Sequence, residues 1–422
     1  FDPTLWGIPG SMIEGADKMA VWNLVTTVDA FISAGFEPAE LLEAIHPTEI
    51  ASTQGTGFGG MSSMRKLFVE RFLGEDVPQD ILQETLPNVI AAHTMQSYVG
   101  GYGAMVQPVA ACASAAVSLE EGLDKIATGK AKFVVTGAND DISVESLEGF
   151  GFMNATADSA SLEAQGIHDR FFSRAGDLRR GGFVEGQGGG TVLIARGDLA
   201  LELGLPVYAV VGYVQTFADG AHTSIPAPGL GALAAGRGGT DSKLARDLAK
   251  LGVTPDDIAV LSKHDTSTNA NDPNEAELHD RLAKALGRTA GNPLHVISQK
   301  TLTGHSKGGA ALFQIAGLTQ VFQNGIVPAN RSLDNLDPAF YERDYLVWLR
   351  DPLNLGKRGP IKAAMATSLG FGHVSSIMAF VHPGAFEAAV ERAHGREAAD
   401  SWRGRAETRM RSGARHLEQG MI

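Results

Sequence analysis

The chain has 422 residues, 44% of them hydrophobic and 20% charged, and its formal net charge is −13 at pH 7. This length suffices for two domain-sized cores, while the acidic balance argues against nucleic acid or an anionic membrane as the main partner. No apolar run approaches the roughly 20 residues that span a bilayer, and the single cysteine excludes an intrachain disulfide and favours a reducing, cytoplasmic setting.

The predicted elements alternate between short apolar runs and amphipathic segments, after an N-terminus that shows neither a signal-peptide pattern nor an initiating Met. We therefore expect a piece of a longer polypeptide. Strands are predicted over 132–136, 190–195, 207–212, 258–262, 294–298 and 361–368. Helices are predicted over 17–34, 114–128, 241–251, 274–286 and 307–322. This alternation favours an α/β fold with largely buried sheets.

The character of the sequence changes at two places. Residues 197–206 separate two stretches of similar strand and helix content, and from about Pro383 the chain becomes charged, with Arg and Glu interspersed. That last part is typical of a solvated or docking helix. We expect an N-terminal half over 1–200, a C-terminal half over 201–383 and a charged helical tail over 384–422.

Cys112 lies where an apolar run gives way to a helical pattern. Ala116, Leu119, Leu123 and Ile126 follow it at spacings of three, four and three. A helix N-terminus carries partial positive charge and unpaired N–H groups, and both favour the nucleophilic thiolate. A buried structural cysteine is the alternative, so this pattern alone leaves both interpretations open.

Three later segments place reactive or aromatic side chains at the ends of predicted strands. His264 follows one strand, Lys300 and His305 lie five apart on a Thr/Gly-rich turn before a helix, and Phe371 stands between glycines after another strand. Each has a structural alternative: a hydrogen-bonded core histidine, a helix cap and simple packing. Their occurrence together with Cys112 on its own turn favours one active site.

These motifs resemble the β-ketoacyl synthase branch of the thiolase-like superfamily, and most closely the ketosynthase domain of type I fatty acid synthases of the fungal and actinobacterial kind. They run from Gly55-Thr-Gly-Phe-Gly-Gly60 through the glycine-rich stretch at 180–190 to Phe371, and the Lys-x-x-Thr-Gly-His spacing at 300–305 is the most specific. Stand-alone bacterial members usually carry Gly where this chain has Asp265 and Ser267, which favours the multifunctional branch.

The resemblance implies a thiolase-like fold in which two similar α/β halves stack as a five-layer α-β-α-β-α sandwich. It also implies that Cys112 accepts an acyl chain from the phosphopantetheine arm of an acyl carrier protein and forms an acyl-enzyme. His264 and His305 would then stabilise the enolate that a malonyl thioester forms as it loses CO₂. The activity implied is that of a 3-oxoacyl-[acyl-carrier-protein] synthase in fatty acid elongation.

Supporting roles follow from the same resemblance. Lys300 would orient His305 and pair with Glu275. Phe371 would supply an oxyanion N–H together with Cys112 and would gate the acyl pocket. Two further side chains would contact the pantetheine arm, namely Thr266 and Thr268.

The resemblance further implies an acyl carrier protein domain as partner, acyl and malonyl thioesters as substrates, and a homodimer within a larger synthase, with residues 132–136 as the candidate edge. No bound cofactor is expected, because phosphopantetheine arrives on the carrier. No metal is expected either, since the 12 histidines show no ligand spacing. Residues 55–60 lack the Lys-Ser/Thr of a phosphate loop and are predicted to form a turn near the active site.

Other functions are weighed against single residues. A thiolase needs a second catalytic cysteine, which this chain lacks. A non-catalytic ketosynthase-like scaffold or chain-length-factor-type partner typically loses the nucleophile, so the presence of Cys112 argues against it. An unrelated cysteine hydrolase has no need for two histidines and a lysine, and it would not decarboxylate malonyl groups.

Overall fold

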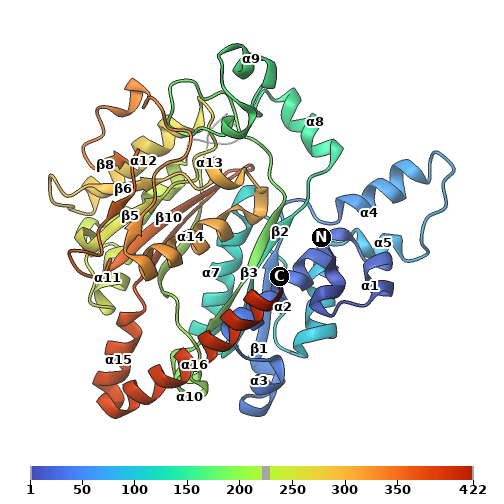
Figure 1. Ribbon diagram of the computed structural model, residues 1–422, viewed down its shortest axis with the longest axis horizontal. Coiled ribbons are helices and arrows are strands. Elements are labelled where there is room, and N and C mark those ends of the chain that lie inside the picture. The colour runs from blue at the N-terminus through green and yellow to red at the C-terminus, as the bar shows by residue number, and fades with distance from the viewer. Residues whose placement is uncertain (1, 221–228, 421–422) are drawn as a thin grey trace. The chain divides into compact units, whose positions relative to one another are not determined.

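The computed structural model describes residues 2–220 and 229–420 (Figure 1). The chain forms two compact units that alternate along the sequence. The first comprises Phe1–Ser143, Gly188–Val207 and Phe386–Ile422, and the second comprises Val144–Gln187 and Tyr208–Ala385. The predicted halves differ from these units mainly at residues 144–187, which the sequence places in the first half and the contacts group with the second.

A three-stranded sheet in the order β1-β2-β3 lies in the first unit, with β1 (Ile50–Gly55) parallel to β2 (Phe133–Asp140) and β3 (Gly188–Ala195) antiparallel to β2. The Thr53 hydroxyl donates to the Ser118 carbonyl on α7 (Ser114–Ala127), whereas the Gln54 amide donates to Thr27 on α2 (Lys18–Ala34). Successive side chains of a strand point to opposite faces, so α7 and α2 cover the two faces of this sheet.

The predicted strands at 132–136 and 190–195 and the helices at 17–34 and 114–128 are confirmed as β2, β3, α2 and α7. The dimer edge proposed at 132–136 is wrong, because β2 is hydrogen-bonded to a strand on each side and has no open edge. β1 was not predicted. Its sequence, Ile-Ala-Ser-Thr-Gln-Gly, is half polar, and these side chains are buried by bonding to the covering helices.

The charged tail forms α15 (Gly384–His394) and α16 (Arg396–Gly420), and α16 packs along α2. Two of its arginines bond to the ends of other helices. Arg405 donates to carbonyls in the last turn of α10 (Gly197–Leu203), and Arg409 donates to the Gly35 carbonyl that follows α2. Cations there satisfy the unpaired last carbonyls of a helix, so the tail is a docked helix.

The second unit contains a six-stranded sheet in the order β4-β11-β10-β5-β6-β8. Strands β10, β5, β6 and β8 are parallel, and β11 is antiparallel to both β10 and β4. Their bounds are β4 Val210–Ala218, β5 Ile258–Ser262, β6 Leu294–Ile297, β8 Leu346–Trp348, β10 Ala363–Gly370 and β11 Val374–Val381. The residues that follow the parallel strands β5, β6 and β10 therefore emerge at one edge of this sheet.

Helices cover this sheet on both faces. Leu248 of α11 (Lys243–Lys250) and Leu282 of α12 (Asn271–Ala285) share a buried apolar core with Met365 of β10. α14 (Ala310–Asn324) contacts β10 as well (Figure 1), and its Gln314 amide donates to the Ser262 and Thr367 carbonyls.

The strands predicted at 258–262, 294–298 and 361–368 are confirmed as β5, β6 and β10, and that at 207–212 as β4, which begins three residues later. The helices at 241–251, 274–286 and 307–322 are confirmed as α11, α12 and α14, the last preceded by a 3-10 turn. Two mixed sheets with covering helices confirm the α/β class. The stacking of the two halves in five layers stays a prediction.

Shorter elements complete both units. They are α1 Gly10–Gly15, α3 Pro38–Ala44, α4 Met61–Arg65, α5 Ile81–Glu84, α6 Pro87–Thr94, α8 Val144–Phe152, α9 Ser159–Ala164, α13 Lys300–Thr303, β7 Ile326–Val327 and β9 Leu353–Asn354. Among the described residues, no single helix is long and apolar enough to cross a membrane. Only α2 and α3 taken together, with a bend of 70° between them, meet the length and composition criteria.

Candidate active site

Cys112 lies in a tight turn of the first unit. It is the middle residue of the 3-10 turn Ala111–Ala113, directly before α7, and its side chain is buried. Ala111 has φ = 46°, a left-handed conformation that costs a residue with a Cβ roughly 1–3 kcal/mol. The Ser114 hydroxyl accepts from the Ala110 N–H at 2.9 Å, and the carbonyl oxygens of Ala111 and Thr56 lie 2.8 and 3.0 Å from it as acceptors. Ser114 thus holds a strained turn with the cysteine at a helix N-terminus, as the sequence predicts.

The glycine-rich loop that follows β1 lies beside this turn. The carboxylate of Asp140, at the end of β2, accepts from the Thr56 hydroxyl at 2.8 Å and from the Gly57 N–H at 2.9 Å. A Cβ on Gly55 would stand 2.6 Å from the Ser118 hydroxyl oxygen, which leaves room only for glycine. The predicted turn at 55–60 is therefore a loop that Asp140 fixes against the Cys112 turn.

His264 follows β5 in the second unit and is buried. The backbone N–H of His264 donates to one carboxylate oxygen of Glu275 at 2.5 Å, and the backbone N–H of Asp265 donates to the other at 2.8 Å. The Lys300 ammonium lies 3.2 Å from the His264 Nδ1 and also donates to the His264 carbonyl. An ammonium can only donate, so Nδ1 accepts and the ring proton of a neutral His264 resides on Nε2.

His305 lies next to His264 within the same unit. The two ring centroids are 5.3 Å apart and the rings are nearly perpendicular, at 89°. The backbone N–H of His305 donates to the Val184 carbonyl at 2.8 Å, and the backbone N–H of Gly186 donates to the His305 carbonyl at 3.0 Å. The glycine-rich stretch at 180–190 therefore positions the His305 turn, a pairing that its sequence did not predict.

Both histidines lie in surroundings that oppose a positive charge. Burial, and then the Lys300 charge, hold the pKa of His264 well below its ordinary value. The pKa of His305 is also well below its ordinary value, because of burial and then the charges of Lys300 and Lys307. Each imidazole is therefore neutral at pH 7 and can present one N–H donor without readily giving up a proton.

Buried charges surround the His264 loop, among them Lys263 and Asp272, which no sequence motif indicated. Lys263 and Asp265 form an ion pair of 2.5 Å, and both side chains are inaccessible to solvent. Burial would raise the pKa of Glu275, but the neighbouring His279 and the charge of Lys263 lower it to about 2. Burial and then the Asp265 charge raise the pKa of Asp272 to about 7. Glu275, whose carboxylate holds the His264 backbone, is thus ionised at pH 7.

The two predicted pantetheine contacts lie together at the start of α12. The hydroxyl oxygens of Thr266 and Thr268 are 3.0 Å apart, and the Thr268 hydroxyl accepts from the Asn271 N–H at 3.1 Å. The role of these hydroxyls stays a prediction. The predicted pairing of Lys300 with Glu275 also stays a prediction. The contacts described above join Lys300 to His264, and Glu275 to the backbone of His264 and Asp265.

Phe371 stands on the three-residue turn between β10 and β11, where Gly372 and His373 both have positive φ. Its ring centroid lies 5.7 Å from that of Phe150 on α8. Phe150 in turn lies 5.2 Å from Phe183, whose ring meets His305 at 5.1 Å. A continuous row of rings therefore connects the predicted gate to a predicted catalytic histidine.

A second buried ion pair lies close to His305. The Lys307 ammonium is 2.7 Å from a Glu185 carboxylate oxygen, and both side chains are at most 2% exposed. The Ser146 hydroxyl of α8 donates to the same oxygen at 3.1 Å. The sequence offered one signal that went unused, namely a lysine inside the small-residue run His-Ser-Lys-Gly-Gly.

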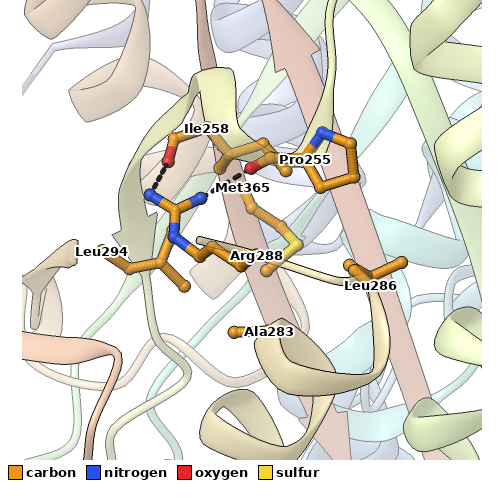
Figure 2. Close-up of a pocket in the computed structure, with 7 residues that line it drawn as sticks. All are labelled: Pro255, Ile258, Ala283, Leu286, Arg288, Leu294 and Met365. Atoms are coloured by element: carbon orange, nitrogen blue, oxygen red, sulfur yellow. Dashed lines mark hydrogen bonds between the residues drawn. The ribbon is translucent and has the colours of Figure 1, made fainter. Parts of the chain in front are cut away.

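One pocket of the second unit is too small for a substrate. Its volume is about 10 Å³, room for roughly one water molecule. Figure 2 shows the Arg288 guanidinium at its edge, donating to the Pro255 carbonyl at 2.6 Å and to the Ile258 carbonyl at 2.7 Å. These bonds fix the chain where it enters β5, so Arg288 has a structural role.

Residues 1–200 match the family model described as beta-ketoacyl synthase, N-terminal domain, and residues 208–334 match the corresponding C-terminal domain. A fatty acid synthase alpha subunit, stcJ of Emericella nidulans, is 37% identical over 91% of this chain and 25% of its own length. Fatty acid synthase 2 of Mycosarcoma maydis is 36% identical over 90% of this chain and 10% of its own length. The chain thus spans a quarter or less of these relatives.

Two solved structures share the fold. The ketosynthase FabY from P. aeruginosa superposes with a TM-score of 0.87 at 24% identity, covering all of this chain and 65% of that one. A beta-ketoacyl synthase from Burkholderia phymatum gives 0.73 at 20% identity, covering 89% of this chain and 84% of that one. At these identities the likeness concerns the fold, and it confirms the predicted fold class.

Proposed function

Because the chain belongs to the β-ketoacyl synthase family, we propose that it is the condensing domain of a larger fatty acid synthase. Its reaction is the decarboxylative Claisen condensation of a malonyl group on an acyl carrier protein with an acyl chain bound to Cys112. One observation supports this most directly. Two buried, neutral histidines stand 5.3 Å apart, and the Lys300 ammonium leaves the His264 proton on Nε2. Acyl transfer alone needs no such pair.

The first step is acyl transfer. The Cys112 thiolate attacks the thioester carbonyl of an acyl carrier protein, and the bond from that carbon to the pantetheine sulfur breaks. The pantetheine leaves as a thiolate and takes up the proton that the Cys112 thiol lost on ionisation. The helix N-terminus at α7 favours the thiolate, and backbone N–H groups of Cys112 and Phe371 receive the oxyanion. The product is an acyl-enzyme thioester.

The second step is decarboxylation and carbon–carbon bond formation. The malonyl carboxylate leaves as CO₂, and the electrons of the broken bond form an enolate on the thioester carbonyl. N–H groups of His264 and His305 stabilise that oxygen, and a neutral imidazole is too weak an acid to protonate the enolate carbon readily. The enolate carbon attacks the acyl carbonyl, and the Cys112 thiolate is released.

The remaining roles belong to the same proposal. Lys300 orients the histidines, Glu275 holds the His264 backbone and Phe371 gates the acyl pocket. Thr266 and Thr268 contact the pantetheine arm. The chemistry calls for no resident cofactor or metal, because phosphopantetheine arrives with the carrier domain. The assembly proposed is a homodimer within a larger synthase in the cytoplasm, with the carrier domain as its partner.

Intact-mass spectrometry tests the proposal. The protein is incubated with a medium-chain acyl thioester, the adduct is mapped, and malonyl thioester is then added. We expect one acyl group on Cys112 that is discharged as 3-oxoacyl product. No adduct with acyl chains of any length would overturn the proposal in favour of a non-catalytic scaffold. An adduct that water discharges as readily as malonyl thioester does would favour a hydrolase.

A further inference from the structure

His279 is a buried histidine that the proposed steps do not use. It lies on α12, four residues after Glu275, and is fully inaccessible to solvent. Its Nε2 is 2.5 Å from the Thr367 hydroxyl oxygen on β10 and 3.7 Å from a Glu275 carboxylate oxygen. Among the residues that the structure describes, its Nδ1 has no hydrogen-bond partner.

The tautomer of His279 follows from these neighbours. A buried N–H without an acceptor costs roughly 1–3 kcal/mol, whereas Nε2 faces a carboxylate and a hydroxyl that can both accept. The proton of a neutral His279 therefore belongs on Nε2. The ring then directs its only donor toward Glu275 and Thr367.

Glu275 holds the loop that carries His264. Its two carboxylate oxygens accept the consecutive N–H groups of His264 and Asp265. Asp265 has φ = 29° and Ser267 has φ = 61°, conformations that residues with a Cβ rarely adopt. Such a loop keeps its shape only if the carboxylate stays ionised and in place.

Thr367 connects the same ring to the strand that carries the gate. It lies four residues before Phe371 on β10, which runs directly into the Phe371 turn. His279 thus lies beside the carboxylate behind His264 and is hydrogen-bonded to the strand behind Phe371.

We propose that His279 is a positioning residue of the condensing site, which fixes the Glu275 carboxylate and thereby the His264 loop against β10. The inference rests on the function proposed above and concerns its decarboxylation step. His279 acts through Glu275 and touches no reacting atom. Acyl transfer to Cys112 does not use His264, so its rate should be insensitive to substitution of His279.

Two rates measured on the full chain test this proposal: acylation of Cys112 by intact mass, and CO₂ release from malonyl thioester. In His279→Leu we expect CO₂ release to fall about tenfold in kcat, with acylation within about twofold of wild type. His279→Gln, whose amide can donate to the same acceptors, should recover most of the loss. His295→Leu, a substitution on β6 in the same unit, is the matched control and should leave the ratio of the two rates unchanged.

Equal loss of both rates in His279→Leu, or CO₂ release within about twofold of wild type, would overturn the proposal. Should His279→Leu not fold, Thr367→Val provides the test, because it removes one acceptor with almost no change of shape. It should lower CO₂ release about threefold and spare acylation. A wild-type protein that shows neither reaction would instead overturn the proposed function, so the two failures are distinguishable.

The pH profile separates positioning from packing. Among the described residues, the titratable and charged groups that act on Glu275 include Lys263, His264 and Asp265 from the loop after β5 and His279 from α12. Loss of the His279 donor raises the Glu275 pKa, and a protonated carboxyl no longer accepts both backbone N–H groups. The acid limb of CO₂ release should therefore move to higher pH in His279→Leu. A limb that stays in place while the melting temperature falls would show a packing role only.

Discussion

The turn at Cys112 and the loop at His264 position reactive side chains by different physical means. Within the Cys112 turn the Ser114 hydroxyl bonds to backbone groups, and the turn carries backbone strain at Ala111, while the Asp140 carboxylate bonds to the neighbouring loop. Around His264 the structure uses buried charges, with Lys263 paired to Asp265 and Glu275 ionised behind the loop.

The difference fits what each group must do in the proposed reaction. A cysteine needs its thiolate form, and a helix N-terminus supplies partial positive charge without a counter-ion. The histidines must stay neutral beside the ammonium of Lys300, which in turn requires carboxylates nearby to balance the buried positive charges. The first unit should therefore respond to changes of backbone geometry, and the second to changes of charge. The predictions below test that separation.

The largest effect is expected at the nucleophile. Cys112→Ala should abolish both the acyl-enzyme and the 3-oxoacyl product, because no other thiol is present. Cys112→Gln, which resembles an acylated cysteine in shape, should block condensation but keep CO₂ release from malonyl thioester. Product analysis and CO₂ release are measured together. Continued chain elongation by Cys112→Ala would disprove the assignment, and loss of CO₂ release in Cys112→Gln would count against separable sites.

The next largest effect is expected at His305. His305→Ala removes one of two donors to the enolate oxygen, so CO₂ release should fall about 10²- to 10³-fold. Acylation of Cys112 should be retained, since it needs only the turn and its oxyanion donors. Intact mass and CO₂ release measure the two rates. Equal losses in both would indicate that His305 holds the fold.

Lys300→Met should act through charge. Lys300 lowers the pKa of both histidines, second only to burial, so its removal raises both pKa values. Imidazolium then forms at higher pH than in the wild type and can protonate the enolate carbon, so the acid limb of condensation should move upward. The lost contact to the His264 Nδ1 should also lower the rate roughly 10- to 100-fold. The control is Lys362→Met, which removes an exposed ammonium, and a limb at the same pH in both variants would refute this role.

The sequence indicated the proposed catalytic side chains more readily than the groups that position them. His264, Lys300 and His305 were found because motifs place them at strand ends, and the structure brings these three together. Glu275 was assigned by resemblance as a partner of Lys300, which stays a prediction, and its hydrogen bond to the His264 backbone was not foreseen. Such a contact depends on how a helix packs beside a loop, and no local pattern records it.

Elements whose side chains are buried by long-range contacts were also missed. β1 is half polar and was not recognised as a strand, because its Thr53 and Gln54 are satisfied by helices far away in sequence. Residues 144–187 fall in the predicted N-terminal half over 1–200, whereas the contacts group them with the second unit. Their partners, such as Lys307 for Glu185, lie more than a hundred residues later. Apolar periodicity indicates which elements form, but it does not identify their partners.

The smallest effect is expected at the Cys112 turn itself. Ser114→Ala removes the hydroxyl that accepts the Ala110 N–H, which should cost roughly 1 kcal/mol and slow acylation of Cys112 about fivefold. CO₂ release should not change, because no charge near the histidines is altered. Ser118→Ala, one turn later on α7, is the control, since within the described residues its hydroxyl has no hydrogen-bond partner. A drop in CO₂ release equal to the drop in acylation would mean that the geometry of the first unit also governs the histidines, and the separation of the two mechanisms would fail.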